Sequence, residues 1–394
     1  MTEKSTDPDA PLRIAVESQS MVPPRSGIGR YAWELTRVIA RQDGVRVLYF
    51  HGTHWLDRWI DMMPPPVRPE AGRFYRRSRE IVPFGRHIRQ AIDTIAFAFM
   101  ARKKRIQIIF APNYIGPDTS VPTVITVHDL SHIRYPETHP DKRVAFLNQA
   151  LPKAIRKARK VLVVSQFTAG EVRALFPEAV DKIQVIYPGV ENRFFSPPDA
   201  EAQMVLADLL HQDDRSYFLF LATLEPRKNL SRILSAYEQL PDKIRQAHPL
   251  VLAGRVGWRE SKFAEPLARL VARREAFLLG FVPDNVLPAL YRGALALLYP
   301  ALYEGFGLPP VEAMAAGCPA LVGNVTAMPE VCGDAALYCN PLDVDSIRDG
   351  MIRLAEDTTV REDLAQRGPQ RASLYSWEKA GSELLTVLKE AARL

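Results

Sequence analysis

The sequence predicts an α/β fold with two Rossmann-like domains in tandem, and three observations carry this prediction. The chain has 394 residues, which at roughly 150 residues per domain is enough for two separate cores. Short, nearly continuous runs of β-branched and other apolar residues alternate with segments of helical periodicity, as in parallel sheets buried on both faces. This alternation occurs in two series, and the composition changes between them from Phe195 to Ser216.

The first series predicts a doubly wound sheet in a domain over residues 1–198. It opens with a strand at 13–18, a glycine loop, and a helix at 31–41. Further strands are expected at 45–50, 107–111, 123–127, 161–164 and 183–186, and helices at 141–157 and 168–175.

The second series predicts a similar domain over residues 216–375. Strands are expected at 217–221, 250–253, 277–281, 295–299, 320–323 and 336–339. Helical patterns lie between them at 230–240, 264–274, 285–292 and 311–316, and helices from 345 to 394 complete the chain. Two such domains leave a cleft between the carboxyl ends of their sheets, which is where α/β folds bind ligands.

Composition excludes several classes of protein. Hydrophobic residues make up 47% of the chain and charged residues 24%, which argues against disorder and collagen-like repeats. The three cysteines, Cys318, Cys332 and Cys339, have no zinc-ligand spacing and indicate a reducing compartment. The first ten residues are polar rather than a signal peptide, and no apolar run approaches the ~20 residues of a membrane span. We therefore expect a cytoplasmic protein.

The most informative motif runs from Tyr303 to Pro319. A strand ends near Pro300, glycines 305 and 307 follow, and Pro309–Pro310 opens a helix whose amino end favours an anion. Glu304 precedes this helix and Glu312 lies in its first turns, where each carboxylate can accept hydrogen bonds from sugar or ribose hydroxyls. The alternatives are a solvated loop acid for Glu304 and a carboxylate complementing the helix dipole for Glu312.

Three other segments supply candidate site residues. Arg227 and Lys228 follow a predicted strand and suit a nucleotide diphosphate, although a surface charged pair is the alternative. Gly27 and Gly29 lie in a loop that can approach a phosphate or simply form a tight turn. His128 follows the strand at 123–127; alternatively, the backbone satisfies its ring and Asp129 caps the next turn.

Together these motifs resemble those of the retaining family 4 glycosyltransferases. Glu304 and Glu312, with seven residues between them, are similar to that family's E-x7-E signature. Thr326–Ala336, Leu224–Leu230, Ser26–Arg30, Val127–Leu130 and Val164–Thr168 match its other blocks in the expected order. The run Gly-Ile-Gly-Arg-Tyr resembles bacterial mannosyltransferases of O-antigen and exopolysaccharide assembly.

The resemblance implies a GT-B fold, with an acceptor-binding first domain and a nucleotide-sugar-binding second domain facing an interdomain cleft. It implies that residues 376–394 form a helix that packs back on the first domain. The implied reaction is transfer of a hexose, most simply mannose from GDP-mannose, to a lipid-linked or growing saccharide with retained configuration and no cofactor. GDP-rhamnose or a UDP-sugar are alternative donors.

The same resemblance implies roles for individual residues. Glu304, His128, Arg227 and Lys228 are the implied catalytic residues. The donor would be bound by ten residues: Gly27, Gly29, Arg227, Lys228, Glu304, Gly305, Phe306, Gly307, Leu308 and Glu312. Relatives often carry a further arginine near Ala222–Thr223; it is missing here, so Arg227 would carry more of the phosphate binding.

We expect no metal site. His132 and His139 are seven residues apart with Pro136 between them, which fits no helical pair of ligands. Asp343-Val-Asp345 follows Asn-Pro and precedes a helix, so we interpret Asp343 as an N-cap.

The net charge of +6 is concentrated in one segment. Eleven Lys or Arg residues and three Asp or Glu residues lie between Arg68 and Arg105. The segment fits peripheral docking on an anionic membrane or a solvated charged face, and no nucleic-acid-binding module accompanies it. A sugar-nucleotide epimerase and a non-catalytic sugar-binding protein remain alternatives for the whole chain.

Overall fold

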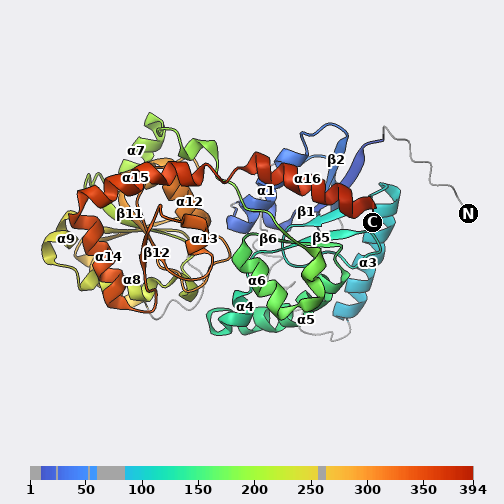
Figure 1. Ribbon diagram of the computed structural model, residues 1–394, viewed down its shortest axis with the longest axis horizontal. Coiled ribbons are helices and arrows are strands. Elements are labelled where there is room, and N and C mark those ends of the chain that lie inside the picture. Colours follow the sequence, from blue (N-terminus) through green and yellow to red (C-terminus); the bar gives the residue numbers. More distant parts are fainter. Residues whose placement is uncertain (1–9, 24, 52–53, 60–84, 256–262, 394) are drawn as a thin grey trace, which may run out of the picture.

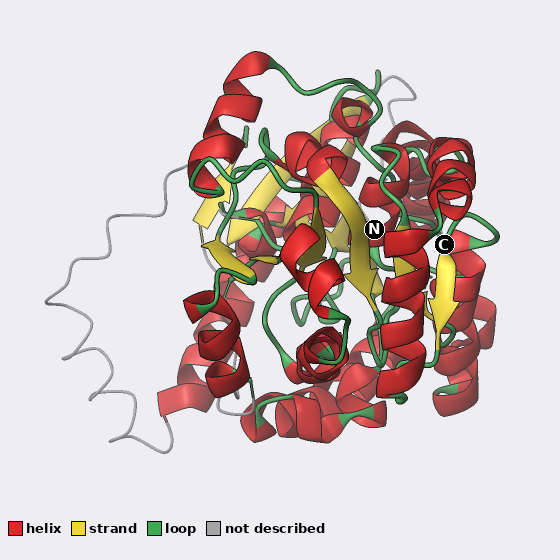
Figure 2. Cartoon of the chain, turned by 90° about the vertical axis from the view of Figure 1, so that its left-hand side faces the viewer, coloured by secondary structure: helices red, strands yellow, loops and turns green. Residues whose placement is uncertain are grey.

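A computed structural model of the chain describes residues 10–23, 25–51, 54–59, 85–255 and 263–393, with only the helical backbone given for 85–93. Two α/β domains lie side by side, each with a sheet between helices (Figure 1). Turned by 90°, the strands again lie between helices on both sides (Figure 2). The predicted pair of Rossmann-like domains is confirmed.

The first sheet has seven strands in the order β3-β2-β1-β4-β5-β6-β7. All neighbours are parallel except the edge pair β2 and β3. The strands are β1 (Leu12–Glu17), β2 (Val45–His51), β3 (His54–Leu56), β4 (Ile108–Ala111), β5 (Thr123–Val127), β6 (Lys160–Val163) and β7 (Ile183–Val185). Their continuous apolar sequences follow from burial on both faces.

Helices and short 3-10 turns surround the first sheet. Those of the first domain are η1 (Gln19–Met21), α1 (Gly27–Ile39), α3 (Gly85–Lys103), α4 (Ser131–Arg134), η2 (Pro136–Thr138), α5 (Asp141–Lys157), α6 (Gln166–Leu175), η3 (Pro177–Lys182) and η4 (Asn192–Phe194). Alternate strand residues divide between two cores: Ile14 and Val16 pack with α1, while Ala15 packs with α3.

The second sheet has six parallel strands in the order β10-β9-β8-β11-β12-β13. The strands are β8 (Tyr217–Leu221), β9 (Leu250–Ala253), β10 (Ala276–Gly280), β11 (Ala294–Tyr299), β12 (Ala320–Gly323) and β13 (Leu337–Cys339). Its helical elements are η5 (Pro226–Lys228), α8 (Leu230–Glu238), α9 (Asp242–Ala247), α10 (Ala264–Ala272), α11 (Leu287–Gly293), α12 (Leu308–Ala315), α13 (Met328–Cys332), α14 (Val344–Glu356) and α15 (Thr358–Ala372). In both sheets the order reverses beside the first strand, which is where such folds bind ligands.

Two further helices connect the domains. Helix α7 (Ala200–Leu209) follows the first sheet and contacts α11 of the second domain. The C-terminal helix α16 (Trp377–Arg393) leaves the second domain and lies along α1 of the first (Figure 1). The contact is close, because a Cβ on Gly381 would lie 2.4 Å from Val38 Cγ1. None of the described helices is long and apolar enough to cross a membrane.

The structure corrects parts of the predicted element list. The sequence did not predict the helices α3, α4, α9 and α13 or the edge strand β3; all of these except α3 are short. It also placed residues 26–30 in a loop, whereas α1 begins at Gly27 because the Ser26 side chain accepts a hydrogen bond from the Gly29 amide. The interpretation of Asp343 as an N-cap is confirmed, since its side chain accepts from the Asp345 amide. Residues 68–84 of the basic segment lie outside the described part of the chain.

Candidate active site

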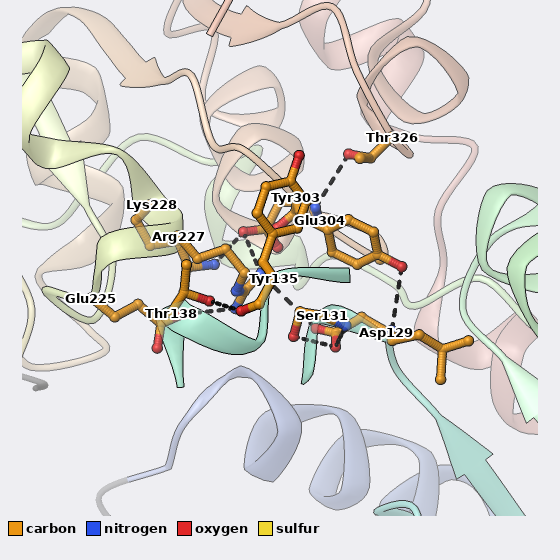
Figure 3. Close-up of polar contacts among 12 residues, drawn as sticks. Asp129, Ser131, Tyr135, Thr138, Glu225, Arg227, Lys228, Tyr303, Glu304 and Thr326 are labelled. Carbon is orange, nitrogen blue, oxygen red and sulfur yellow. Dashed lines mark hydrogen bonds and ion pairs between the residues drawn. The ribbon is translucent and has the colours of Figure 1, made fainter. Parts of the chain in front are cut away.

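Charged side chains from both domains meet beyond the carboxyl ends of three strands. His128 and Asp129 follow β5 of the first sheet. Arg227 and Lys228 form the turn η5 after β8, and Glu304 lies after β11. Arg227 and Lys228 each contact Glu304 directly (Figure 3).

Glu304 is the centre of this cluster. Its Oε1 accepts hydrogen bonds from Arg227 Nη1 at 3.1 Å, from Tyr299 OH at 3.2 Å, and from Lys228 Nζ. Only 7% of the residue is exposed, so the alternative of a solvated loop acid is wrong. A buried carboxylate with two cations beside it is the arrangement that low-dielectric surroundings require.

Arg227 is held by more than one carboxylate. Besides Glu304, its Nη2 donates to Glu225 at 2.7 Å, and its Nη1 lies 3.9 Å from Asp129 Oδ2 of the first domain. Burial lowers the pKa of Arg227, but the three carboxylates outweigh it and raise the pKa above the ordinary value. The guanidinium therefore stays charged, and the interpretation of Arg227 as part of a surface pair is wrong.

The backbone that presents Arg227 and Lys228 is fixed by Asn229. This residue has a left-handed conformation, with φ of 66°, and ends the η5 turn. Its Nδ2 donates to Pro300 O at 2.9 Å and Pro341 O at 2.6 Å. The Arg227 carbonyl in turn accepts from the Leu302 amide. The turn after β8 is thus attached to the end of β11, which brings both cations to Glu304.

The glycine-rich segment joins Glu304 to helix α12. Gly305 lies against the first domain, because a Cβ there would be 1.8 Å from the His128 carbonyl oxygen. Gly307 has φ of 91° at the N-cap of α12. Phe306 is buried, with its ring centroid 5.2 Å from that of Tyr375. Leu308 is the first residue of α12, and its Cδ1 would lie 3.7 Å from a Cβ on Gly27.

His128 is held by the backbone, which was the alternative interpretation of this residue. Its Nε2 lies 2.7 Å from Pro112 O, and because a carbonyl only accepts, this nitrogen carries the proton. Burial lowers the pKa of His128, so the ring is neutral at pH 7 and its Nδ1 is an acceptor. The contact orients the ring and leaves Nδ1 able to accept a hydrogen bond from a hydroxyl.

Asp129 links the two domains. Its Oδ1 accepts from Ser131 N at 3.0 Å and from Ser131 Oγ at 2.7 Å (Figure 3). It also accepts from Tyr114 OH at 3.1 Å. Burial raises the pKa of Asp129, but Arg227 and the Ser131 hydrogen bonds outweigh it and hold the pKa below the ordinary range. Asp129 therefore caps the following turn and also faces Arg227 across the domain boundary.

Glu312 lies apart from this cluster, on α12. It is 4% exposed, and its contacts are Arg30 of α1 and Tyr291 of α11. The two glutamates of the motif therefore occupy different polar surroundings. Glu304 contacts the cations Arg227 and Lys228, whereas Glu312 contacts Arg30 of helix α1 at the domain boundary.

Comparison with known proteins identifies the family. Residues 25–193 match the family model described as Glycosyltransferase Family 4, and residues 205–371 match that of Glycosyl transferases group 1. O-antigen chain mannosyltransferase B of Escherichia coli is 34% identical over 390 residues, which covers 96% of this chain and 100% of the relative. The chain belongs to the family 4 glycosyltransferases.

Two further comparisons agree with this assignment. The serotype-specific mannosyltransferase WbdA of Escherichia coli is 32% identical over 272 residues, covering 66% of this glycosyltransferase and 33% of WbdA. The crystal structure of WaaG, a glycosyltransferase involved in lipopolysaccharide biosynthesis, superposes with a TM-score of 0.70 at 16% identity, covering 95% of this chain and 99% of WaaG. The second likeness shows the GT-B fold. This chain is a glycosyltransferase, and relatives named as mannosyltransferases support transfer of a hexose.

In this glycosyltransferase Gly27 and Gly29 are not loop residues. Both lie in the first turn of α1. A Cβ on Gly29 would be 2.3 Å from Ser20 O, so close approach of two backbone segments requires this glycine. Their place in donor binding stays a prediction.

Sequence reasoning missed the contacts at the amino end of α6. Ser165 Oγ donates to Gly305 O at 2.6 Å. The Glu330 carboxylate accepts from the amides of Gln166 and Phe167 at 2.7 and 2.8 Å, and Tyr187 OH donates to it at 2.8 Å. Glu330 belongs to the second domain and the helix to the first, so no local pattern predicts this pairing.

The described residues contain no cluster of three or more His, Cys, Asp or Glu side chains arranged to hold a metal ion. His132 and His139 are both buried, and His139 Nε2 lies 2.8 Å from Ser131 Oγ.

Proposed function

We propose that this enzyme transfers mannose from GDP-mannose to a hydroxyl of a lipid-linked or growing saccharide in cell-surface polysaccharide assembly, with anomeric configuration retained. The sugar and the pathway rest on the full-length similarity to a relative named O-antigen chain mannosyltransferase B. The chemistry rests on one observation: two cations, Arg227 and Lys228, share the Glu304 carboxylate at the carboxyl ends of the strands.

In this proposal Arg227 and Lys228 bind the donor diphosphate. Both lie on the η5 turn, which Asn229 attaches to the end of β11, and charges held in place in this way stabilise a leaving group most effectively. The bond between the anomeric carbon and the phosphate oxygen breaks as the acceptor oxygen bonds to the same face. The acceptor proton passes to the departing phosphate oxygen.

The surroundings of Glu304 support this route over a covalent intermediate. A carboxylate that accepts from Arg227, Lys228 and Tyr299 is largely neutralised, which makes it a poor nucleophile. Its remaining lone pairs can accept hydrogen bonds from donor-sugar hydroxyls. At Nδ1, the neutral His128 ring can accept a hydrogen bond from a hydroxyl of the donor sugar or of the acceptor saccharide.

A donor screen followed by turnover tests the proposal. The thermal-shift screen covers GDP, UDP, ADP and their sugar conjugates, and GDP and GDP-mannose should give the largest shifts. A shift only with UDP or ADP compounds would show that GDP-mannose is not the donor, while the reaction class would stand. Glu304→Gln should lower transfer by about 100-fold or more. The matched control Glu265→Gln changes an exposed glutamate on α10 and should retain activity. Full turnover by Glu304→Gln, or inverted configuration of the product by NMR, would overturn the mechanism.

We further propose that the first domain docks on an anionic membrane through α3. Ile95 and Phe99 are 69% and 67% exposed, one helical turn apart, and the exposed Arg102 and Lys103 follow at the end of the same helix. Apolar side chains beside cations are typical of surfaces that bind the headgroup region of a membrane. Flotation with phosphatidylglycerol vesicles at low salt should recover the wild type. An Ile95→Ser, Phe99→Ser variant that floats equally well would remove α3 from the interface.

A further inference from the structure

Arg30 of helix α1 reaches from the first domain into a group of carboxylates. Its Nη1 donates to Glu312 Oε1 at 2.5 Å, and its Nη2 donates to Asp284 Oδ1 at 2.8 Å. Its Nε lies 3.6 Å from Glu191 Oε1. Only 13% of the side chain is exposed. All three guanidinium nitrogens thus face acidic side chains, and two of these belong to the second domain.

Glu312 is fixed on both of its oxygens by these contacts. Arg30 donates to Oε1, and the buried Tyr291 donates to Oε2 at 2.9 Å. An ionised carboxylate has about four acceptor positions, so two donors orient the group and leave one lone pair on each oxygen. Two lone pairs on adjacent oxygens match the two neighbouring hydroxyls of a ribose.

We propose that Arg30 is a positioning residue for the nucleotide half of the donor site: from the first domain, it keeps the Glu312 carboxylate charged and oriented to accept the ribose hydroxyls. The inference rests on the proposed function, because it takes the nucleotide sugar as donor and the Glu312 carboxylate as the group that accepts its ribose hydroxyls. Arg30 acts through Glu312 and does not itself touch the donor.

The electrostatics of the cluster show what Arg30 does for Glu312. Burial raises the pKa of Glu312, and Arg30 is the main charge opposing that rise. The other groups that face the cluster are Tyr291 from α11, Asp284 from the segment between β10 and α11, and Glu191 and Arg193 from the segment before α7. Without the guanidinium, burial and the charge of Glu191 act on Glu312 with less opposition, and its pKa rises further. The carboxyl then takes up a proton at a higher pH, and a protonated carboxyl loses acceptor capacity.

The test is GDP binding by the full-length enzyme as a function of pH. Isothermal titration from pH 5 to pH 8 compares the wild type with Arg30→Met, which removes the charge and keeps a long side chain. We expect the Arg30→Met affinity to fall about tenfold at pH 7, and the pH of half-maximal affinity on the acid side to rise. Arg30→Lys should restore part of both, because it returns the charge without the forked geometry. Arg41→Met, at an exposed position directly after α1, is the matched control and should behave as the wild type.

Other outcomes separate this inference from the proposed function. Arg30→Met could lower the melting temperature or kcat but leave the acid limb of GDP binding unchanged. In that case Arg30 only stabilises the contact between the domains, and the inference is overturned. If the methionine variant fails to fold, the acid limb of GDP binding is compared between Arg30→Lys and the wild type instead. Glu312→Gln should bind GDP weakly with no acid limb; wild-type binding by this variant would remove Glu312 from the ribose and end the inference, while transfer could still proceed. A wild type that binds no nucleotide diphosphate would overturn both.

Discussion

Gly305→Ala is expected to impair transfer by displacing the donor loop from the first domain. The added Cβ would lie 1.8 Å from the His128 carbonyl oxygen, 2.9 Å from the carbonyl carbon and 3.1 Å from Asp129 Cβ. Since Cβ contacts below 3.0 Å essentially do not occur, the loop must retreat by at least about 1.2 Å. The obstacle is backbone at the end of β5, so no side chain can rotate away.

This displacement acts on the neighbouring residue, Glu304. It also breaks the hydrogen bond from Ser165 Oγ to Gly305 O, which is 2.6 Å long. A misplacement of about 1 Å at a reacting centre costs roughly 100-fold in rate. We therefore expect kcat of Gly305→Ala to fall by about two orders of magnitude. GDP affinity should fall less, because Glu312 on α12 and Arg30 on α1, which we assign to the nucleotide half of the donor site, do not belong to this loop.

The assay is steady-state transfer from GDP-mannose, with the folded state checked by circular dichroism and thermal shift. Gly170→Ala is the matched control. Gly170 lies inside α6, and a Cβ there meets nothing within 4 Å. That variant should keep full activity and gain about 0.5–1 kcal/mol of stability. A folded Gly305→Ala enzyme with kcat within threefold of the wild type would refute the argument that this contact sets the position of Glu304.

Three other predictions concern the half-buried Glu330, the buried His132 and the three buried cysteines. Glu330→Gln should lower the free energy of unfolding by about 1–3 kcal/mol, because the charged acceptor for the amides of Gln166 and Phe167 is lost; an unchanged urea midpoint would show that the contact adds nothing. His132 is 1% exposed and burial lowers its pKa to about 4, so the unfolded chain takes up a proton at this histidine before the folded one does, and stability should fall as the pH drops from about 6.5 to 4. His132→Phe should reduce that fall, measured as the difference in urea midpoint between pH 7 and pH 5. Burial raises the pKa of Cys318, Cys332 and Cys339 to about 12, so the folded protein should not react with a thiol reagent at pH 8, and unfolding in guanidinium should release all three thiols.

Much of the fold could be predicted from local sequence patterns. The strands Thr123–Val127 and Tyr217–Leu221 and the helix Asp141–Lys157 have the predicted bounds, because continuous apolar runs and helical periodicity are properties of a few neighbouring residues. Prediction failed at the start of α1, where Gly-Ile-Gly indicates a loop but the Ser26 cap begins a helix.

The candidate site could be predicted only in part. The sequence indicated Arg227, Lys228 and Glu304 because each follows a strand, and carboxyl ends of parallel strands meet at one edge of a sheet. That the three share one contact depends on the neighbouring positions of β8 and β11.

By itself, therefore, the sequence determined the two α/β domains, the family, and which residue types stand at the strand ends. Only the tertiary structure decided that Arg30 contacts Glu312, that Asp129 faces Arg227, and that Glu330 caps α6. Each of these pairs joins residues of different domains that are about 100 to nearly 300 positions apart. Local patterns cannot predict such pairs, because their distance depends on how the two sheets are ordered and how the domains pack.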